Sequence, residues 1–109
     1  MQRLAGKVAL IVGAGSVGPG WGNGRAISVL FAREGAKVFG ADKSIDAAAE
    51  TKRLAEAEGH TIAIGEVDVT NPESIKAMVD ACLQTFGRID VLVNNVGGSA
   101  PGDVVSMPL

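Results

Sequence analysis

The 109-residue sequence has little cysteine, histidine and aromatic content, and no excess of positive charge. Its single cysteine, Cys82, excludes a disulfide within the chain and is typical of a reducing compartment. A formal net charge of −2 gives a nucleic acid or an anionic membrane surface no electrostatic support. The N-terminal apolar run stops at Gly13, too short to span a bilayer, and has no leader-peptide pattern. We therefore expect a soluble, cytoplasmic protein that binds neither nucleic acid nor membrane.

Apolar residues are abundant by contrast. They make up 47% of the chain, and the mean hydropathy of +0.27 is high for a small soluble domain. Such a composition indicates segments that are buried on two sides, and apolar surface that a further partner would cover.

Short apolar runs alternate with longer amphipathic segments. The runs are continuous, as parallel strands covered on both faces require. The expected strands are Lys7–Val12, Lys37–Ala41, Thr61–Val69 and Asp90–Val93. The expected helices are Arg25–Arg33, Ile45 to about Glu58, and Pro72–Phe86. This order predicts a Rossmann-type α/β fold: three α/β/α layers around a parallel sheet, incomplete, with about four strands and three helices.

Local signals mark the ends of these helices. Ser44 and Asn71 are typical capping residues, and Gly87 is well placed to end the third helix. Cys82 falls on the apolar stripe of that helix, so we expect it in the core rather than as a reactive thiol. The lone histidine, His60, precedes a strand in a turn; we assign no catalytic residue and no metal ligand.

The stretch Val12–Ala26, VGAGSVGPGWGNGRA, holds six glycines between the first strand and the first helix. Its Gly13–Gly18 part matches G-x-G-x-x-G, but that register needs a helix running through Pro19 and further glycines, each costing about 1 kcal/mol against alanine. The helix is therefore expected to begin at Asn23 or Gly24. In that register Gly13 makes the sharp turn off the strand, while Gly22 and Gly24 allow backbone to approach a pyrophosphate.

Four signatures in this order resemble the short-chain dehydrogenase/reductase family: the glycine loop, an acid in GADKS, Asp-Val in VDVT, and NNVG. The resemblance covers essentially the whole chain. Gly13, Gly22 and Gly24 fill the family's T-G-x-x-x-G-x-G glycine places, and Val17–Trp21 is a five-residue insertion. Val12 stands where the family usually has threonine, and Asn23 where it usually has isoleucine.

The resemblance implies dinucleotide binding. Asp42, at the end of the second strand, would accept hydrogen bonds from the adenosine ribose, and its charge would repel a 2′-phosphate, which predicts NAD rather than NADP. Lys43 is the opposing feature, a cation that could turn toward such a phosphate. By resemblance Asp68 and Val69 flank the adenine; the alternative is a plain strand end that leads into the next helix. The predicted cofactor contacts are Gly13, Gly15, Ser16, Gly22, Asn23, Gly24, Asp42, Lys43, Asp68, Val69, Asn95, Val96 and Gly97.

The family's catalytic groups are not found in this sequence. By resemblance, hydride transfer between nicotinamide and an alcohol or ketone uses a serine, an asparagine, and the tyrosine and lysine of Y-x-x-x-K. The chain has no tyrosine, and neither Ser99 nor Ser106 falls at the family's serine position. We therefore expect residues 1–109 to be the N-terminal part of a single NAD(P)-binding domain, from a longer NAD-dependent oxidoreductase that forms homo-oligomers.

Two further expectations follow from that interpretation. The strand at Asp90–Asn94 would be left as an exposed, apolar sheet edge, prone to aggregation. Two other functions remain open: a stand-alone dinucleotide-binding module without catalytic activity, and a scaffold whose sheet is completed by another chain.

Overall fold

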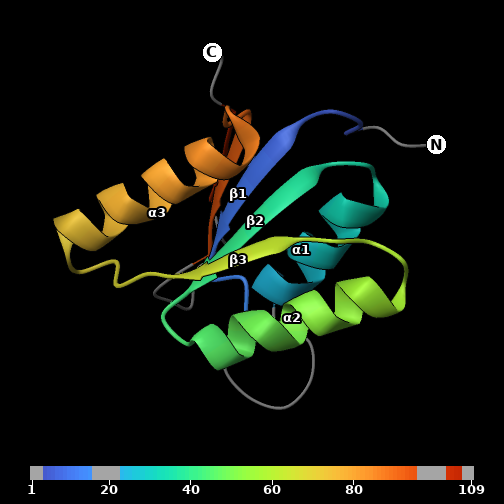
Figure 1. Cartoon of the computed structure of the whole chain (residues 1–109), viewed down its shortest axis with the longest axis horizontal. Coiled ribbons are helices and arrows are strands. Elements are labelled where there is room, and N and C mark those ends of the chain that lie inside the picture. Colours follow the sequence, from blue (N-terminus) through green and yellow to red (C-terminus); the bar gives the residue numbers. More distant parts are fainter. Residues whose placement is uncertain (1–3, 16–22, 96–102, 107–109) are drawn as a thin grey trace.

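The computed structural model describes residues 4–15, 23–95 and 103–106. The elements are β1 (Val8–Val12), α1 (Asn23–Arg33), β2 (Lys37–Asp42), α2 (Ile45–Ala57), β3 (Ala63–Glu66), α3 (Pro72–Phe86), β4 (Val91–Asn94) and β5 (Asp103–Ser106). Within these ranges the strands form one sheet in the order β3-β2-β1-β4-β5, and the first four are parallel. Helices α1 and α2 cover one face and α3 covers the other (Figure 1). The predicted three-layer α/β fold is confirmed.

The exposed-edge prediction for the Asp90–Asn94 strand is wrong. β5 pairs antiparallel with β4, from Val91 opposite Ser106 to Asn94 opposite Asp103. The connection between the two strands is shorter than the dozen or so residues that a parallel crossover needs, so the chain can return only in the antiparallel direction. β4 is therefore an interior strand of the sheet.

The third strand is shorter than predicted. It ends at Glu66, because the following residues turn toward α3 instead of continuing the ladder. The Val67 amide still donates to the Asp42 carbonyl oxygen at 3.0 Å. The Asp68 carboxylate then accepts from the Thr70 amide at 2.9 Å and closes a local turn.

The predicted helix caps are confirmed. The Ser44 hydroxyl accepts from the Ala47 amide at 3.2 Å, and the Asn71 side-chain oxygen accepts from the Glu73 amide at 2.9 Å. Gly87 ends α3 with a φ of +82°, a left-handed conformation that glycine adopts without a steric penalty. None of the helices in the described ranges is both long enough and apolar enough to cross a bilayer.

The core lies on both faces of the sheet. Neighbouring residues of β1 point to opposite sides: Ile11 packs in a cluster with Val93 beneath α1 and α2, and Leu10 packs with Met78 and Cys82 beneath α3. Burial raises the pKa of the Cys82 thiol to about 11, so the group stays protonated near neutral pH. The prediction that this cysteine is a core residue is confirmed.

A buried carboxylate joins the two central strands at their start. Asp90 Oδ2 accepts from the Val8 amide at 2.8 Å, and the Asp90 amide donates to the Val8 carbonyl oxygen at 2.8 Å. Arg88 Nε donates to Asp90 Oδ1 at 3.0 Å. The pKa of Asp90 lies below its ordinary value, first because the Arg88 guanidinium donates to the carboxylate and second because the Val8 amide does.

Asp90→Asn is expected to destabilise the fold at pH 7 and to have a much smaller effect in acid. Because the folded-state pKa of Asp90 is lowered, its contribution to stability is complete above the unfolded-state pKa of about 3.9. That contribution is lost as the pH falls through the folded-state pKa. Urea unfolding should therefore show a smaller difference in the free energy of unfolding between the wild type and Asp90→Asn at pH 2.5 than at pH 7. Asp80→Asn, at an exposed acid of α3, is the control and should change the free energy of unfolding little at either pH. A larger stability difference between the wild type and Asp90→Asn at pH 2.5 than at pH 7 would contradict the stabilising role given to the ionised Asp90.

Candidate functional site

The carboxyl ends of the parallel strands and the start of α1 meet at one edge of the sheet. Gly13 follows β1 with a φ of +85°, and its amide donates to the Ala41 carbonyl oxygen of β2 at 2.7 Å. The Asn95 amide, just after β4, donates to the Val12 carbonyl oxygen at 2.9 Å. The chain thus turns sharply off β1 and stays against the ends of both neighbouring strands, the place where doubly wound folds bind their ligands.

Gly24 brings the first turn of α1 against that glycine turn. A Cβ on Gly24 would lie 1.6 Å from the Gly13 carbonyl oxygen and 3.0 Å from Asn95 Nδ2. No side chain fits in this space, so α1 can reach the loop after β1 only with glycine here. The helix begins at Asn23, as predicted from the glycine content of the preceding loop.

Asp42 is held by two backbone amides at the end of β2. The Gly15 amide donates to its Oδ2 atom and the Ser44 amide donates to its Oδ1 atom, both at 2.9 Å. A Cβ on Gly15 would lie 2.4 Å from the Cβ of Ala47, so the loop after β1 also touches α2 closely. Lys43, the next residue, is exposed.

Asp68 and Val69 continue along the same edge after β3. The Asp68 Oδ1 atom accepts from the Thr70 amide at 2.9 Å and from the Thr70 hydroxyl at 2.6 Å, and these bonds lower the pKa of Asp68. The Asp68 amide donates to Ser74 Oγ at 2.9 Å. The carboxylate therefore shapes the turn into α3, which is the local role weighed against adenine binding. An adenine contact for either residue stays a prediction.

An apolar cavity of about 310 Å³ lies between the sheet and α3. Its lining residues come from β1, β4, α3 and the adjoining turns: Leu10, Val12, Val69, Ile75, Met78, Val79, Ile89, Leu92 and Asn94. Part of the apolar stripe of α3 thus borders this cavity, together with the face of the sheet beneath it.

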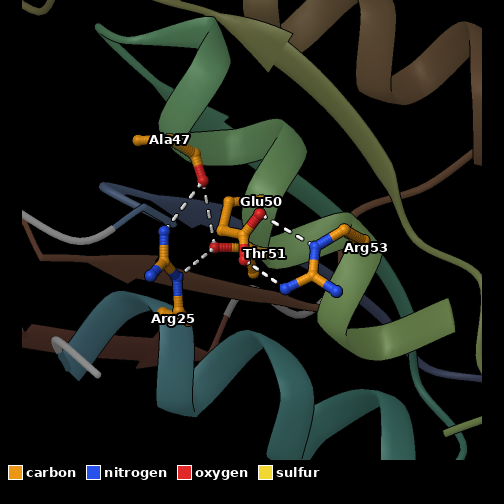
Figure 2. Close-up of polar contacts among 5 residues, drawn as sticks. All are labelled: Arg25, Ala47, Glu50, Thr51 and Arg53. Carbon is orange, nitrogen blue, oxygen red and sulfur yellow. Dashed lines mark hydrogen bonds and ion pairs between the residues drawn. The ribbon is translucent and has the colours of Figure 1, made fainter. Parts of the chain in front are cut away.

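A buried polar cluster next to the glycine turn was not predicted from the sequence. Arg25 is 8% exposed and Thr51 is fully buried, and the two side chains meet between α1 and α2 (Figure 2). One sequence signal was available, because Thr51 is the polar residue on the alanine-rich inner stripe of α2, beside Ala48 and Ala55.

The predicted contacts divide into those that the structure brings together at the glycine turn, those that follow the ends of β2 and β3 (Lys43, Asp68 and Val69), and those outside the described residues. The structure brings together the glycines after β1 and at the start of α1, the acid that ends β2, and the amide after β4: Gly13, Gly15, Gly24, Asp42 and Asn95. Ser16, Gly22, Val96, Gly97 and the Val17–Trp21 insertion lie outside the described residues, and of Asn23 only the backbone is described. Among the side chains that the structure describes, no three His, Cys, Asp or Glu residues converge as metal ligands would.

Comparison with known proteins places this geometry in a family. The chain is 42% identical over 96 residues to a 3-oxoacyl-(acyl-carrier-protein) reductase of Thermotoga maritima, covering 88% of this chain and 37% of that protein. It superposes on a hydroxysteroid dehydrogenase from Escherichia coli with a TM-score of 0.82 and 35% identity, over 92% of this chain and 40% of that one.

A third similar protein was solved in complex with NAD. It is a short chain dehydrogenase/reductase from Burkholderia phymatum, with a TM-score of 0.74 and 37% identity over 84% of this chain and 31% of that chain. The chain thus spans two fifths or less of the length of these proteins. The family model for short chain dehydrogenases matches residues 7–108, and the chain belongs to that family.

Proposed function

We propose that the chain binds NAD at the edge formed by Gly13, Gly24 and Asp42, as the cofactor-binding part of a short-chain oxidoreductase. The observation that carries this is the contact of Gly24 with the Gly13 carbonyl, which sets the N-terminus of α1 against the turn after β1. The first N–H groups of a helix have no partner within it, and its dipole favours an anion there. This arrangement suits a pyrophosphate.

The charges around the site fit a dinucleotide. The first turns of α2 and α3 carry Asp46 and Glu73, whereas the first turn of α1 carries no acid. No carboxylate of that turn therefore competes with a phosphate for its N–H groups. Asp42, fixed at the end of β2, is the acceptor expected for the adenosine ribose hydroxyls.

When bound, the oxidised cofactor would accept a hydride from the carbinol carbon of an alcohol substrate, and the reduced cofactor would supply one to a carbonyl carbon. Residues 1–109 would bind and orient the cofactor. The proton-transfer groups would belong to further segments, because the family's tyrosine is missing from this sequence. An alcohol or ketone substrate, homo-oligomers and a cytoplasmic location belong to the same proposal, and a pure binding module is the alternative that the missing tyrosine favours.

We also propose that residues 1–109 are the N-terminal part of one dinucleotide-binding domain. The chain matches about two fifths of the length of its E. coli relative, and the cavity on the α3 face is lined by apolar residues of β1 and β4, of which Leu92 of β4 is partly exposed. Sheets of this type are covered on both faces, so further segments packed on this side would complete the domain.

The first test compares NAD with NADP by calorimetric titration of the chain. Because a 2′-phosphate would approach the Asp42 carboxylate, NAD should bind at least about tenfold more tightly. Asp42→Asn removes the charge at almost constant shape and should reduce this preference severalfold. Asp46→Asn, at an exposed acid in the first turn of α2, is the charge-matched control and should keep the preference for NAD.

Each outcome of this titration decides a different claim. NADP binding as tightly as NAD would contradict the cofactor assignment. Binding of neither would contradict dinucleotide binding altogether. Hydride transfer to any carbonyl compound by residues 1–109 alone would contradict the claim that these residues bind the cofactor but do not supply the proton-transfer groups.

A further inference from the structure

A buried arginine links α1 to α2 beside the proposed cofactor site. Arg25 lies in the first turn of α1 and is 8% exposed. Its Nε atom donates to Thr51 Oγ1 at 3.0 Å, and its Nη2 atom donates to the Ala47 carbonyl oxygen at 3.2 Å (Figure 2). Burying a guanidinium is costly unless it is hydrogen-bonded, so these acceptors on α2 fix where the side chain lies.

Thr51 also hydrogen-bonds to the loop that follows Gly13. Its hydroxyl has one proton to donate, and two carbonyl oxygens lie within reach: Ala14 at 2.9 Å and Ala47 at 3.3 Å. The Ala47 oxygen already accepts from Arg25, and the Ala14 oxygen is closer. The hydroxyl therefore accepts from Arg25 and donates to Ala14.

The Ala14 carbonyl and the Gly15 amide belong to the same peptide group. Thr51 holds the oxygen of this peptide from α2, and Asp42 Oδ2 holds its N–H from β2 at 2.9 Å. A peptide group is planar, so fixing one end sets the direction of the other. Loss of the Thr51 hydroxyl would leave the Ala14 oxygen without this donor and free the Gly15 amide to turn away from Asp42.

We propose that Thr51, oriented by Arg25, is a positioning residue for the dinucleotide: through the Ala14–Gly15 peptide it orients the Asp42 carboxylate that recognises the adenosine ribose. This inference rests on the proposed function. It assigns Arg25 and Thr51 no contact with the cofactor. The competing explanation is that the two side chains only hold α1 and α2 together.

A pair of Thr51 variants separates these roles. Thr51→Val keeps the shape and removes the hydroxyl, whereas Thr51→Ser keeps the hydroxyl and removes the methyl group. Positioning predicts that Thr51→Val weakens NAD binding at least about tenfold, and that Thr51→Ser stays within about threefold of the wild type. A packing role predicts the opposite order. Thr85→Val is the matched control, because the Thr85 hydroxyl donates to the Ala81 carbonyl oxygen within α3, away from the glycine turn.

The ratio of the NAD and NADP affinities is the second readout. Thr51→Val should reduce the preference for NAD, since a less ordered Asp42 discriminates less well against the 2′-phosphate. Arg25→Met should have a similar effect, and the double variant should be little worse than either single one, because both act through one chain of bonds. Arg53→Met, at an exposed arginine paired with Glu50, should bind as the wild type does.

The outcomes distinguish this proposal from the one on which it rests. Calorimetry is combined with circular dichroism, so that affinities are compared between folded variants. If the wild type binds NAD and Thr51→Val binds it equally well with an unchanged NAD-to-NADP ratio, the positioning role is overturned and the proposed function stands. If the wild type binds no dinucleotide, both are overturned.

Discussion

Replacing Gly24 with alanine should abolish detectable dinucleotide binding and lower the free energy of unfolding by about 3 kcal/mol. The added Cβ would lie 1.6 Å from the oxygen and 2.7 Å from the carbon of the Gly13 carbonyl. Both atoms are backbone, so relief requires α1 to move away from the turn after β1. That movement would also take the helix N–H groups away from the site. Urea unfolding and calorimetric titration with NAD measure the two effects.

Gly59→Ala is the control for this prediction. Gly59 has a φ of +88°, and a Cβ there would meet nothing within 4 Å. Alanine should therefore cost only the strain of the left-handed conformation, about 1–2 kcal/mol, with NAD affinity unchanged. A Gly24→Ala chain as stable as Gly59→Ala, and still binding NAD, would show that the contact with Gly13 is not required.

The start of α1 could be predicted because it depends on local chemistry. A helix that ran through Pro19 and the loop glycines would lose about 1 kcal/mol at each glycine, and this placed the first turn at Asn23 or Gly24. The caps at Ser44 and Asn71 were predictable for the same reason, since each side chain binds an amide two or three residues further along. Gly24 was expected to make room for a phosphate. The structure shows a second reason why no side chain fits at this position, which is the closeness of the Gly13 carbonyl.

Features that depend on contacts between distant segments could not be predicted. β5 is only four residues long, which is too short for a hydrophobic period to identify it as a strand. Its pairing with β4 depends on the length of the connection between the two strands. The link from Arg25 to Thr51 exists only once α1 packs on α2. The bond between Gly15 and Asp42 joins residues 27 apart in sequence. Recognising Asp42 and the glycines from their spacing did not reveal that the Asp42 carboxylate accepts a hydrogen bond from the Gly15 amide.

Alanine substitutions at two neighbouring residues of β1 should differ in cost. Ile11 is 0% exposed and packs beneath α1 and α2, so Ile11→Ala should lower the free energy of unfolding by about 4 kcal/mol. Leu10 is equally buried but faces α3 and borders the 310 Å³ cavity. Side-chain atoms that face a cavity have fewer packing partners to lose, so Leu10→Ala should cost only about 2 kcal/mol. Urea unfolding of both variants in residues 1–109 gives the comparison.

The same pair tests whether the domain continues onto the α3 face. If further segments of a full-length chain pack over β1 and β4, they fill the space beside Leu10 and leave Ile11 unaffected. The cost of Leu10→Ala should then rise toward that of Ile11→Ala in a chain extended to the length of the relatives. Leu10→Met, which nearly conserves volume, is the control and should cost less than about 1.5 kcal/mol in both lengths. Equal costs for the two alanine variants already in residues 1–109 would show that the α3 face is fully packed without any addition.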